Sequence, residues 1–379
     1  MQKSLTAIDI KILQALFELG PRNLTAVAKK IGISRELLRF RLKRMRDNPQ
    51  LFLRMHTAIY HTNLGLKKAV VVLEAEPGME QLLFDCLLVN DFWLYACRSY
   101  GMGEGCTAIY AIPVEHCHEF EEFIYELMRL RIAKNICIYW TTCFQGGRIT
   151  PEWFDNNKNQ WTFRWDDWIK EVQTQTTDLP YTLIEPKGYP IYADELDVRM
   201  LEELEFDATI NLNKLSEILG ISPQLARFHF HEHLIGKNLI EGYEIFIMRY
   251  GDLPSLMTLF IISFDDYEKF TKFARSLQNK PFILMMAKAI GENVLLTEVF
   301  LPFNEFRTFI DKLSELAKMK LLRSYKYAIQ DLRIRRRQTI FPKLFKEKSW
   351  IYDHKKHMDV LQQKVSQFLL KTEQSRSYR

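Results

Sequence analysis

The hydrophobic positions of the chain form two long patterns that repeat the same order of helices and strands. At an offset of 188 residues, 23–34 aligns with 211–222, and each segment reads as a helix, a glycine turn and a serine-capped helix. Before the first segment, residues 8–16 carry apolar side chains at the i, i+4, i+5 and i+8 spacing of a buried helix face. Gly32 permits the tight turn, and Ser34 is a favourable N-cap. We therefore predict a helix-turn-helix at the start of each half.

A second pattern follows each of these segments. In the first half we expect strands and helices in the order β-α-β-β-α-β at 69–76, 79–89, 92–100, 106–112, 115–130 and 135–142. In the second half the same order is expected at 256–264, 267–277, 282–290, 294–301, 304–319 and 321–329. This order is typical of a ferredoxin-like domain. The sequence thus predicts an α+β protein of two tandem units, each a (winged) helix-turn-helix followed by a ferredoxin-like βαββαβ domain.

The repeat also suggests where the domains begin and end. We expect helix-turn-helix domains at 1–62 and 191–250, ferredoxin-like domains at 66–145 and 254–332, a connection at 146–190, and a basic C-terminal segment at 333–379. The connection contains four tryptophans, which favour an ordered, packed segment over a floppy linker. Its Trp161-x-Phe163 recurs as Trp350-x-Tyr352 at an offset of 189.

Composition places the chain among ordinary globular proteins. It has 379 residues, with 52 Lys+Arg against 47 Asp+Glu, a formal net charge of +5 and six cysteines. No apolar run approaches the roughly 20 residues that cross a bilayer, and the cysteines are too few for a disulfide scaffold. We therefore expect a cytoplasmic protein that does not enter the membrane.

The small net charge hides a strong separation of charge along the chain. Residues 1–60 have a net charge of +8, the corresponding window 189–248 has −7, and the segment 333–379 has +9. The first predicted third helix is the most basic region, which suits contacts with base edges and phosphates of double-stranded DNA. The alternative is a solvated helix face. The candidate DNA-binding residues are Ser34, Arg35, Arg39, Arg41, Lys43, Arg44, Arg46, Arg335, Arg336 and Arg337.

With these motifs in place, the sequence resembles the Lrp/AsnC family of prokaryotic, especially archaeal, transcription regulators. The resemblance is carried by Ile8-Asp9-x-x-Ile12-Leu13, by the two Gly-Ile-Ser turns at 32–34 and 220–222, and by the segments 235–243 and 291–302. It implies a DNA-binding regulator with a small-molecule effector that works as a homodimer or, because the unit is duplicated, as an internal pseudo-dimer. By the same resemblance, effector contacts are expected at Gly101, Gly103, Gly105 and Gly291. The acidic second helix-turn-helix is expected to be a scaffold or protein contact.

Candidate chemistry is sparse. No nucleophile with a base and no paired carboxylates stand out, so we expect neither catalytic residues nor a cofactor. His229-x-His231-x-His233 lacks further ligands at a recognisable spacing, so no metal site is expected and exposed histidines are favoured. Cys97 and Cys106 flank a predicted turn, where they could form a redox pair, although buried free cysteines are the default. Two alternatives to a regulator remain: a tetrapyrrole enzyme like the siroheme decarboxylases, which resemble these regulators, and a metabolite-binding or assembly protein that does not bind DNA.

Overall fold

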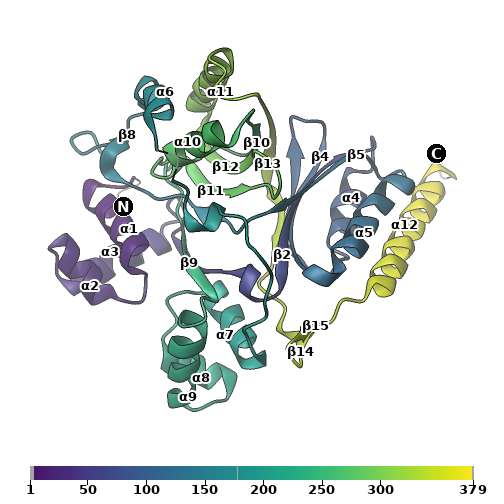
Figure 1. The fold of residues 1–379 in the computed structure, drawn as a ribbon, viewed down its shortest axis with the longest axis horizontal. Helices are drawn as coiled ribbons and strands as arrows, with labels where there is room; N and C mark the ends of the chain where they lie inside the picture. The colour runs from purple at the N-terminus through teal and green to yellow at the C-terminus, as the bar shows by residue number, and fades with distance from the viewer. Residues whose placement is uncertain (1–3, 177, 378–379) are drawn as a thin grey trace. The chain divides into compact units, whose positions relative to one another are not determined.

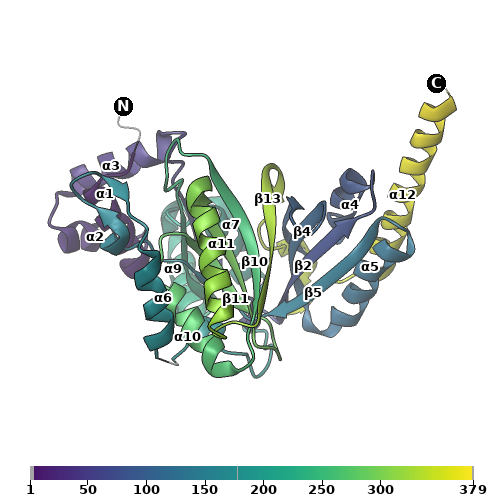
Figure 2. The ribbon, with the colours of Figure 1, turned by 90° about the horizontal axis from the view of Figure 1, so that it is seen from above.

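The computed structural model describes residues 4–176 and 178–377, and it has the predicted α+β architecture (Figures 1 and 2). The first half begins with α1 (Ala7–Leu19), α2 (Leu24–Ile31) and α3 (Arg35–Asp47). The second half begins with α7 (Glu195–Phe206), α8 (Leu212–Leu219) and α9 (Pro223–Phe228), followed by a π-helix at His229–Ile235. Side-chain caps explain two of these starts, because the hydroxyl oxygens of Ser34 and Ser222 each accept a backbone N–H bond at 3.1 Å.

Each half continues with a wing strand and a ferredoxin-like order of elements. The wing strands β1 (Arg54–Ile59) and β9 (Ile240–Phe246) pair antiparallel with each other. The first ferredoxin-like segment consists of β2 (Leu66–Ala75), α4 (Glu80–Leu87), β3 (Trp93–Tyr100), β4 (Gly105–Pro113), α5 (Cys117–Arg129) and β5 (Ala133–Thr141). The second consists of β10 (Ser255–Ser263), α10 (Tyr267–Leu277), β11 (Ile283–Lys288), β12 (Val294–Pro302), α11 (Phe303–Lys318) and β13 (Ser324–Arg337).

The chain folds into two compact units, and each unit combines distant parts of the sequence. Unit 1 contains the residues up to Tyr60 together with Thr142–Glu185 and Arg199–Lys326, whereas unit 2 contains His61–Thr141, Pro186–Val198 and the residues from Tyr327 onward. In unit 1 the antiparallel strand order is β10-β12-β11-β6, where β6 is Gln145–Gly146. In unit 2 it is β5-β2-β4-β3-β13. The last strand of the second half therefore pairs with β3 of the first half.

A short aromatic hairpin and a helix follow each ferredoxin-like segment. After the first segment these are β7 (Phe154–Asp155), β8 (Gln160–Trp161) and α6 (Trp165–Thr174). After the second they are β14 (Phe345–Lys346), β15 (Ser349–Trp350) and α12 (His354–Ser377). Within unit 1, α6 packs on α10 and α11, and within unit 2, α12 packs on α4 and α5 (Figure 1). Each hairpin and helix thus covers the ferredoxin-like segment of the other half of the sequence.

Two features of the fold bear on the sequence predictions. Among the described residues, no helix combines the length and apolar character needed to cross a membrane. Cys97 and Cys106 are free and buried, as the default expectation had it, and the strand register places Cys106 opposite Arg98 and Cys97 opposite Thr107. Neighbouring positions along a strand point to opposite faces of the sheet, so the two thiols do not face each other.

Candidate functional site

Two basic residues of α3 stabilise the first helix-turn-helix from inside. The Asp9 carboxylate is fully buried, and it accepts hydrogen bonds from Arg41 Nη1 at 3.2 Å and from Arg44 Nη2. Arg41 also donates to the Thr6 hydroxyl at 3.0 Å. An unpaired carboxylate in this position would cost several kcal/mol, roughly 3–5 when one partner of such a pair is removed. Arg41 and Arg44 therefore hold α3 against α1 and do not belong to an exposed DNA-binding face, contrary to the prediction.

The other basic side chains of α3 are exposed, while Ser34 serves as its N-cap. Arg39, Lys43 and Arg46 line a cavity of about 650 Å³ in unit 1. Arg22 and the segment 209–212 line it as well. We call it the basic cavity. Arg35 is exposed on the same helix but does not line it.

A second cavity of unit 1, of about 580 Å³, has mainly aromatic walls. We call it the aromatic cavity; its principal lining residues are Phe154, Trp161, Phe163, Arg249, Tyr250 and Phe303. The β7–β8 hairpin is fixed by a hydrogen bond from Trp161 Nε1 to the Arg249 carbonyl oxygen at 2.9 Å. Phe163 stacks on Trp165, with ring centroids 5.5 Å apart, and lies 5.9 Å from the ring of Tyr250. This size and lining are typical of a site for a flat organic ligand.

Arg249 is the unusual residue of the aromatic cavity. Its side chain is buried, with the residue only 3% exposed, and Nη1 donates to the carbonyl oxygens of Pro281 and, at 2.9 Å, Ile283. Within the described ranges no acidic side chain forms an ion pair with it, and Nε is buried without a hydrogen-bond acceptor. Burial lowers the pKa of Arg249 to about 10, so the guanidinium remains charged at neutral pH. A buried charge without a counterion is costly, so this position favours an anionic ligand.

Two further groups of the aromatic cavity have polar side chains that can take part in proton transfer. Glu305 is half-buried, and its Oε2 accepts a hydrogen bond from Trp165 Nε1 at 2.7 Å. Burial raises the pKa of Tyr250, whose phenol therefore stays protonated near neutral pH. The cavity thus combines a cation that has no acidic partner among the described residues, a carboxylate, a phenol and apolar ring surfaces.

The glycine turn between β3 and β4 has a packing explanation. A Cβ atom on Gly105 would lie 1.9 Å from the Leu73 carbonyl oxygen, and one on Gly103 would lie 2.5 Å from the Glu74 side chain. Gly101 belongs to the same turn, and Gly291 belongs to a turn in unit 1. Neither of the two cavities described above includes these glycines. The glycines that were expected to contact an effector therefore lie outside both the basic and the aromatic cavity.

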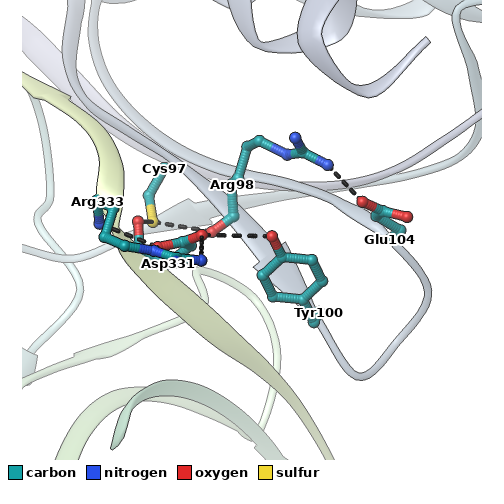
Figure 3. Close-up of polar contacts among 6 residues, drawn as sticks. All are labelled: Cys97, Arg98, Tyr100, Glu104, Asp331 and Arg333. Atoms are coloured by element: carbon teal, nitrogen blue, oxygen red, sulfur yellow. Dashed lines mark hydrogen bonds and ion pairs between the residues drawn. The ribbon is translucent and has the colours of Figure 1, made fainter. Parts of the chain in front are cut away.

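Beside this turn, Asp331 organises a set of polar contacts in unit 2 (Figure 3). Arg333 and Tyr100 both point toward its carboxylate, with Arg333 Nη2 at 2.9 Å and the Tyr100 hydroxyl at 3.4 Å from Oδ2. Hydrogen bonding to Arg333 lowers the pKa of Asp331 to about 2. The contacts lie at an irregularity in the pairing of β13 with β3, between Gln330 and Arg335. They are satisfied within the protein and brace this irregularity.

The remaining candidate residues are also placed by the fold. The candidate DNA-binding residues Arg335, Arg336 and Arg337 lie in β13, paired with Cys97, Ala96 and Tyr95 of β3, so they belong to a strand of the sheet. The expectation of surface histidines holds for His231 but not for His229, which is buried. The rings of His229 and His233 lie together on the π-helix with centroids 4.4 Å apart.

Comparison with known proteins identifies a fold neighbour over nearly the whole chain. No protein-family model matches the sequence, and no curated protein matches it. The crystal structure of the siroheme decarboxylase NirDL matches with a TM-score of 0.54 and 9% identity, covering 94% of this chain and 98% of that one. The same enzyme in co-complex with an iron-uroporphyrin III analogue matches with a TM-score of 0.55 and 9% identity over the same shares. AsnC of E. coli matches 37% of this chain and 94% of its own, with a TM-score of 0.28 and 18% identity.

These findings correct the functional prediction. A fold neighbour that spans both halves of the chain is an enzyme. The prediction of a DNA-binding transcription regulator without catalytic activity is therefore wrong, and the alternative of a tetrapyrrole enzyme fits better. Sequence reasoning also missed Arg249, which stands in no motif. The repeated Trp161-x-Phe163 was the available signal for the aromatic cavity.

Proposed function

We propose that the protein is an enzyme that binds a carboxylated tetrapyrrole and removes carboxyl groups from it as CO2. The single observation that carries the proposal is Arg249, which lines the aromatic cavity and whose buried guanidinium forms no ion pair with an acidic side chain of the described residues. The full-length fold likeness to siroheme decarboxylase NirDL supports it. A tetrapyrrole fits this cavity, because a flat macrocycle packs on aromatic rings and its carboxylates can pair with a guanidinium.

The roles of the residues follow from the charge changes of decarboxylation. The bond between the carboxyl carbon and its neighbour breaks, CO2 leaves, the electron pair stays on the neighbouring carbon, and a proton is added there. An ion pair stabilises the departing carboxylate and slows its loss, whereas a water-poor surrounding favours it. We therefore propose that Arg249 binds a carboxylate that is not lost and so anchors the substrate. Trp161 and Phe163 would surround the substrate side chain that loses CO2. Glu305 is assigned the delivery of the proton, because it is the carboxylic acid among the cavity-lining residues.

Binding of iron-uroporphyrin III, followed by its absorption spectrum, tests the anchoring role. Arg249→Met is expected to weaken binding by at least about tenfold, because a ligand carboxylate loses a buried charged partner. Arg249→Lys keeps the charge without the forked donors and should fall between that variant and the wild type. Arg164→Met is the matched control, since Arg164 is exposed at the start of α6 and does not line the cavity. Circular dichroism and unfolding curves verify that each variant is folded.

Turnover is tested by incubating the wild type and Glu305→Gln with siroheme and following the product by mass spectrometry. We expect the wild type to release CO2, and Glu305→Gln to bind the tetrapyrrole normally while losing most of the turnover. Equal binding by the wild type and a folded Arg249→Met would contradict the assigned site. Absence of any spectral change with the wild type would contradict tetrapyrrole binding altogether.

A further inference from the structure

The basic cavity lies between two copies of the same turn. Asn23-Leu24 at the start of α2 and Asn211-Leu212 at the start of α8 are equivalent at the offset of 188 residues. Leu24, Asn211 and Leu212 all line the cavity. The asparagine side chains cap their helices, accepting N–H bonds from Ala26 at 3.1 Å and Lys214 at 2.9 Å. The other first-turn N–H groups of a helix have no acceptor within it, so two positive helix ends meet this cavity.

Four cationic side chains line the same cavity, against the single carboxylate of Asp47. Arg39, Lys43 and Arg46 follow the i, i+4, i+7 spacing of one face of α3. Their charged groups make no ion pair or hydrogen bond with any residue of the described part of the chain. These three positive charges repel one another, and an anion bound between them would lower the repulsion. The face therefore favours binding of an anion.

Arg22 differs from these three because its position is fixed. Its Nη1 donates to the Ile210 carbonyl oxygen at 2.7 Å, and its guanidinium lies over the Phe230 ring at 4.5 Å. Burial lowers its pKa, opposed by the nearby Tyr243 and Asp207. One cation is thus held in place by the fold, while the three exposed side chains on α3 can turn toward a ligand.

We propose that the basic cavity binds a small polyanion that carries two or more phosphate or carboxylate groups. Convergence of guanidinium groups and helix N-termini is the usual way in which proteins bind such oxyanions. The shape favours a small molecule over a nucleic-acid duplex, because α3 shares the cavity with the segment 209–212, whereas a helix that enters the major groove needs an unobstructed face. This site is separate from the aromatic cavity, and the inference does not depend on the proposed function.

Isothermal titration of the full chain with pyrophosphate and, in a second arm, with citrate tests the inference and distinguishes phosphate from carboxylate ligands. The double variant Arg39→Gln/Lys43→Gln is expected to weaken binding by at least about tenfold, since two charged hydrogen bonds are lost. Arg35→Gln is the matched control on the same helix and should bind like the wild type. The three side chains that change, Arg35, Arg39 and Lys43, are exposed, so the variants should fold normally.

Titration with iron-uroporphyrin III separates the two cavities. The double variant should bind this tetrapyrrole like the wild type, and Arg249→Met should bind pyrophosphate or citrate like the wild type. The inference is overturned if the wild type binds neither anion, if Arg35→Gln loses as much affinity as the double variant, or if a DNA duplex binds where both small anions fail. It is also overturned if the double variant loses tetrapyrrole affinity, because the basic cavity would then be part of the substrate site.

Discussion

The same aromatic hairpin occurs once in each unit, and its surroundings differ between the two. In unit 1, β7–β8 contributes Trp161, and the chain directly after it contributes Phe163, to a cavity of about 580 Å³. In unit 2, the equivalent Tyr352 stacks on His116 with ring centroids 4.9 Å apart and lies 5.5 Å from Phe92. One copy thus borders a space large enough for a ligand, whereas the other packs its rings against protein.

What the two copies share is the anchor of the hairpin. Trp161 Nε1 donates to the Arg249 carbonyl oxygen at 2.9 Å, and Trp350 Nε1 donates to the Leu64 carbonyl oxygen at 2.6 Å. What differs is the chemistry around it: at the offset of 189, Glu305 of unit 1 corresponds to His116 of unit 2. Both copies therefore keep the hydrogen bond from tryptophan to a backbone carbonyl oxygen, whereas the neighbouring side chains differ. This difference predicts that equivalent substitutions act on ligand binding in unit 1 and on stability in unit 2.

The largest expected effect is a difference in the free energy of unfolding between variants of Trp350 and Trp161, the tryptophans that hold the two hairpins. Trp350 is 5% exposed and packs on Phe345 and Phe92, so Trp350→Ala should lower the free energy of unfolding by about 3–5 kcal/mol. Trp161 is only half-buried, and Trp161→Ala should lower it by about 1–2 kcal/mol. Chemical denaturation followed by circular dichroism measures both values. Equal losses would show that the two hairpins serve the same structural role.

The next pair of variants sharpens the contrast through ligand binding. Phe163→Ala removes a ring from the aromatic cavity and should weaken iron-uroporphyrin III binding by about threefold to tenfold, because an aromatic contact contributes roughly 0.5–1.5 kcal/mol beyond buried area. Tyr352→Phe removes only the hydroxyl that accepts a bond from Asn90 Nδ2 at 2.9 Å, and should cost about 1 kcal/mol of stability without changing ligand affinity. If Tyr352→Phe weakened tetrapyrrole binding as much as Phe163→Ala, the assignment of the site to unit 1 would be wrong.

Local signals in the sequence were sufficient for the order of helices and strands within each half. Ser34 forms the side-chain cap that its position predicts, and the alternating and helical periods give both ferredoxin-like segments in the correct order. These features depend on residues a few positions apart. The exchange of the hairpins between halves could not be read in this way, because it depends on which sheet each segment packs against.

The site was harder to predict because it depends on contacts that are distant in sequence. Six basic residues on α3 look alike in the sequence, but Arg41 and Arg44 turn toward the buried Asp9, which lies 32 and 35 residues away. Arg249 looks like an ordinary surface residue until its guanidinium is seen bound to the carbonyl oxygens of Pro281 and Ile283. Counting charged residues in the sequence does not show which cations form ion pairs inside the protein. For this reason the basic residues of α3 led to the prediction of DNA binding.

The smallest expected effect concerns how the helix after each hairpin docks. On α12, Lys356 Nζ and His357 Nε2 lie 2.7 and 3.3 Å from Asp91 Oδ2 in unit 2, and the bond with His357 lowers the pKa of Asp91 to about 2. On α6, Asp166 pairs with Lys312 in unit 1, but its side chain is 83% exposed. Because the folded-state pKa of Asp91 lies below its ordinary value of about 3.9, its carboxylate contributes stability that is complete above that value and is lost as the pH falls toward 2.

Comparing the free energy of unfolding of the wild type with that of Asp91→Asn between pH 6 and pH 2 tests this docking contact. The difference should be below about 1 kcal/mol at pH 6, because Asp91 is partly exposed and solvent screens the pair, and it should vanish near pH 2. Asp166→Asn serves as the control and should show no measurable difference at any pH. A difference for Asp91→Asn that stays constant with pH would mean that packing, and not the carboxylate charge, holds α12 at this contact, and the contrast between the two helices would then rest on their apolar faces.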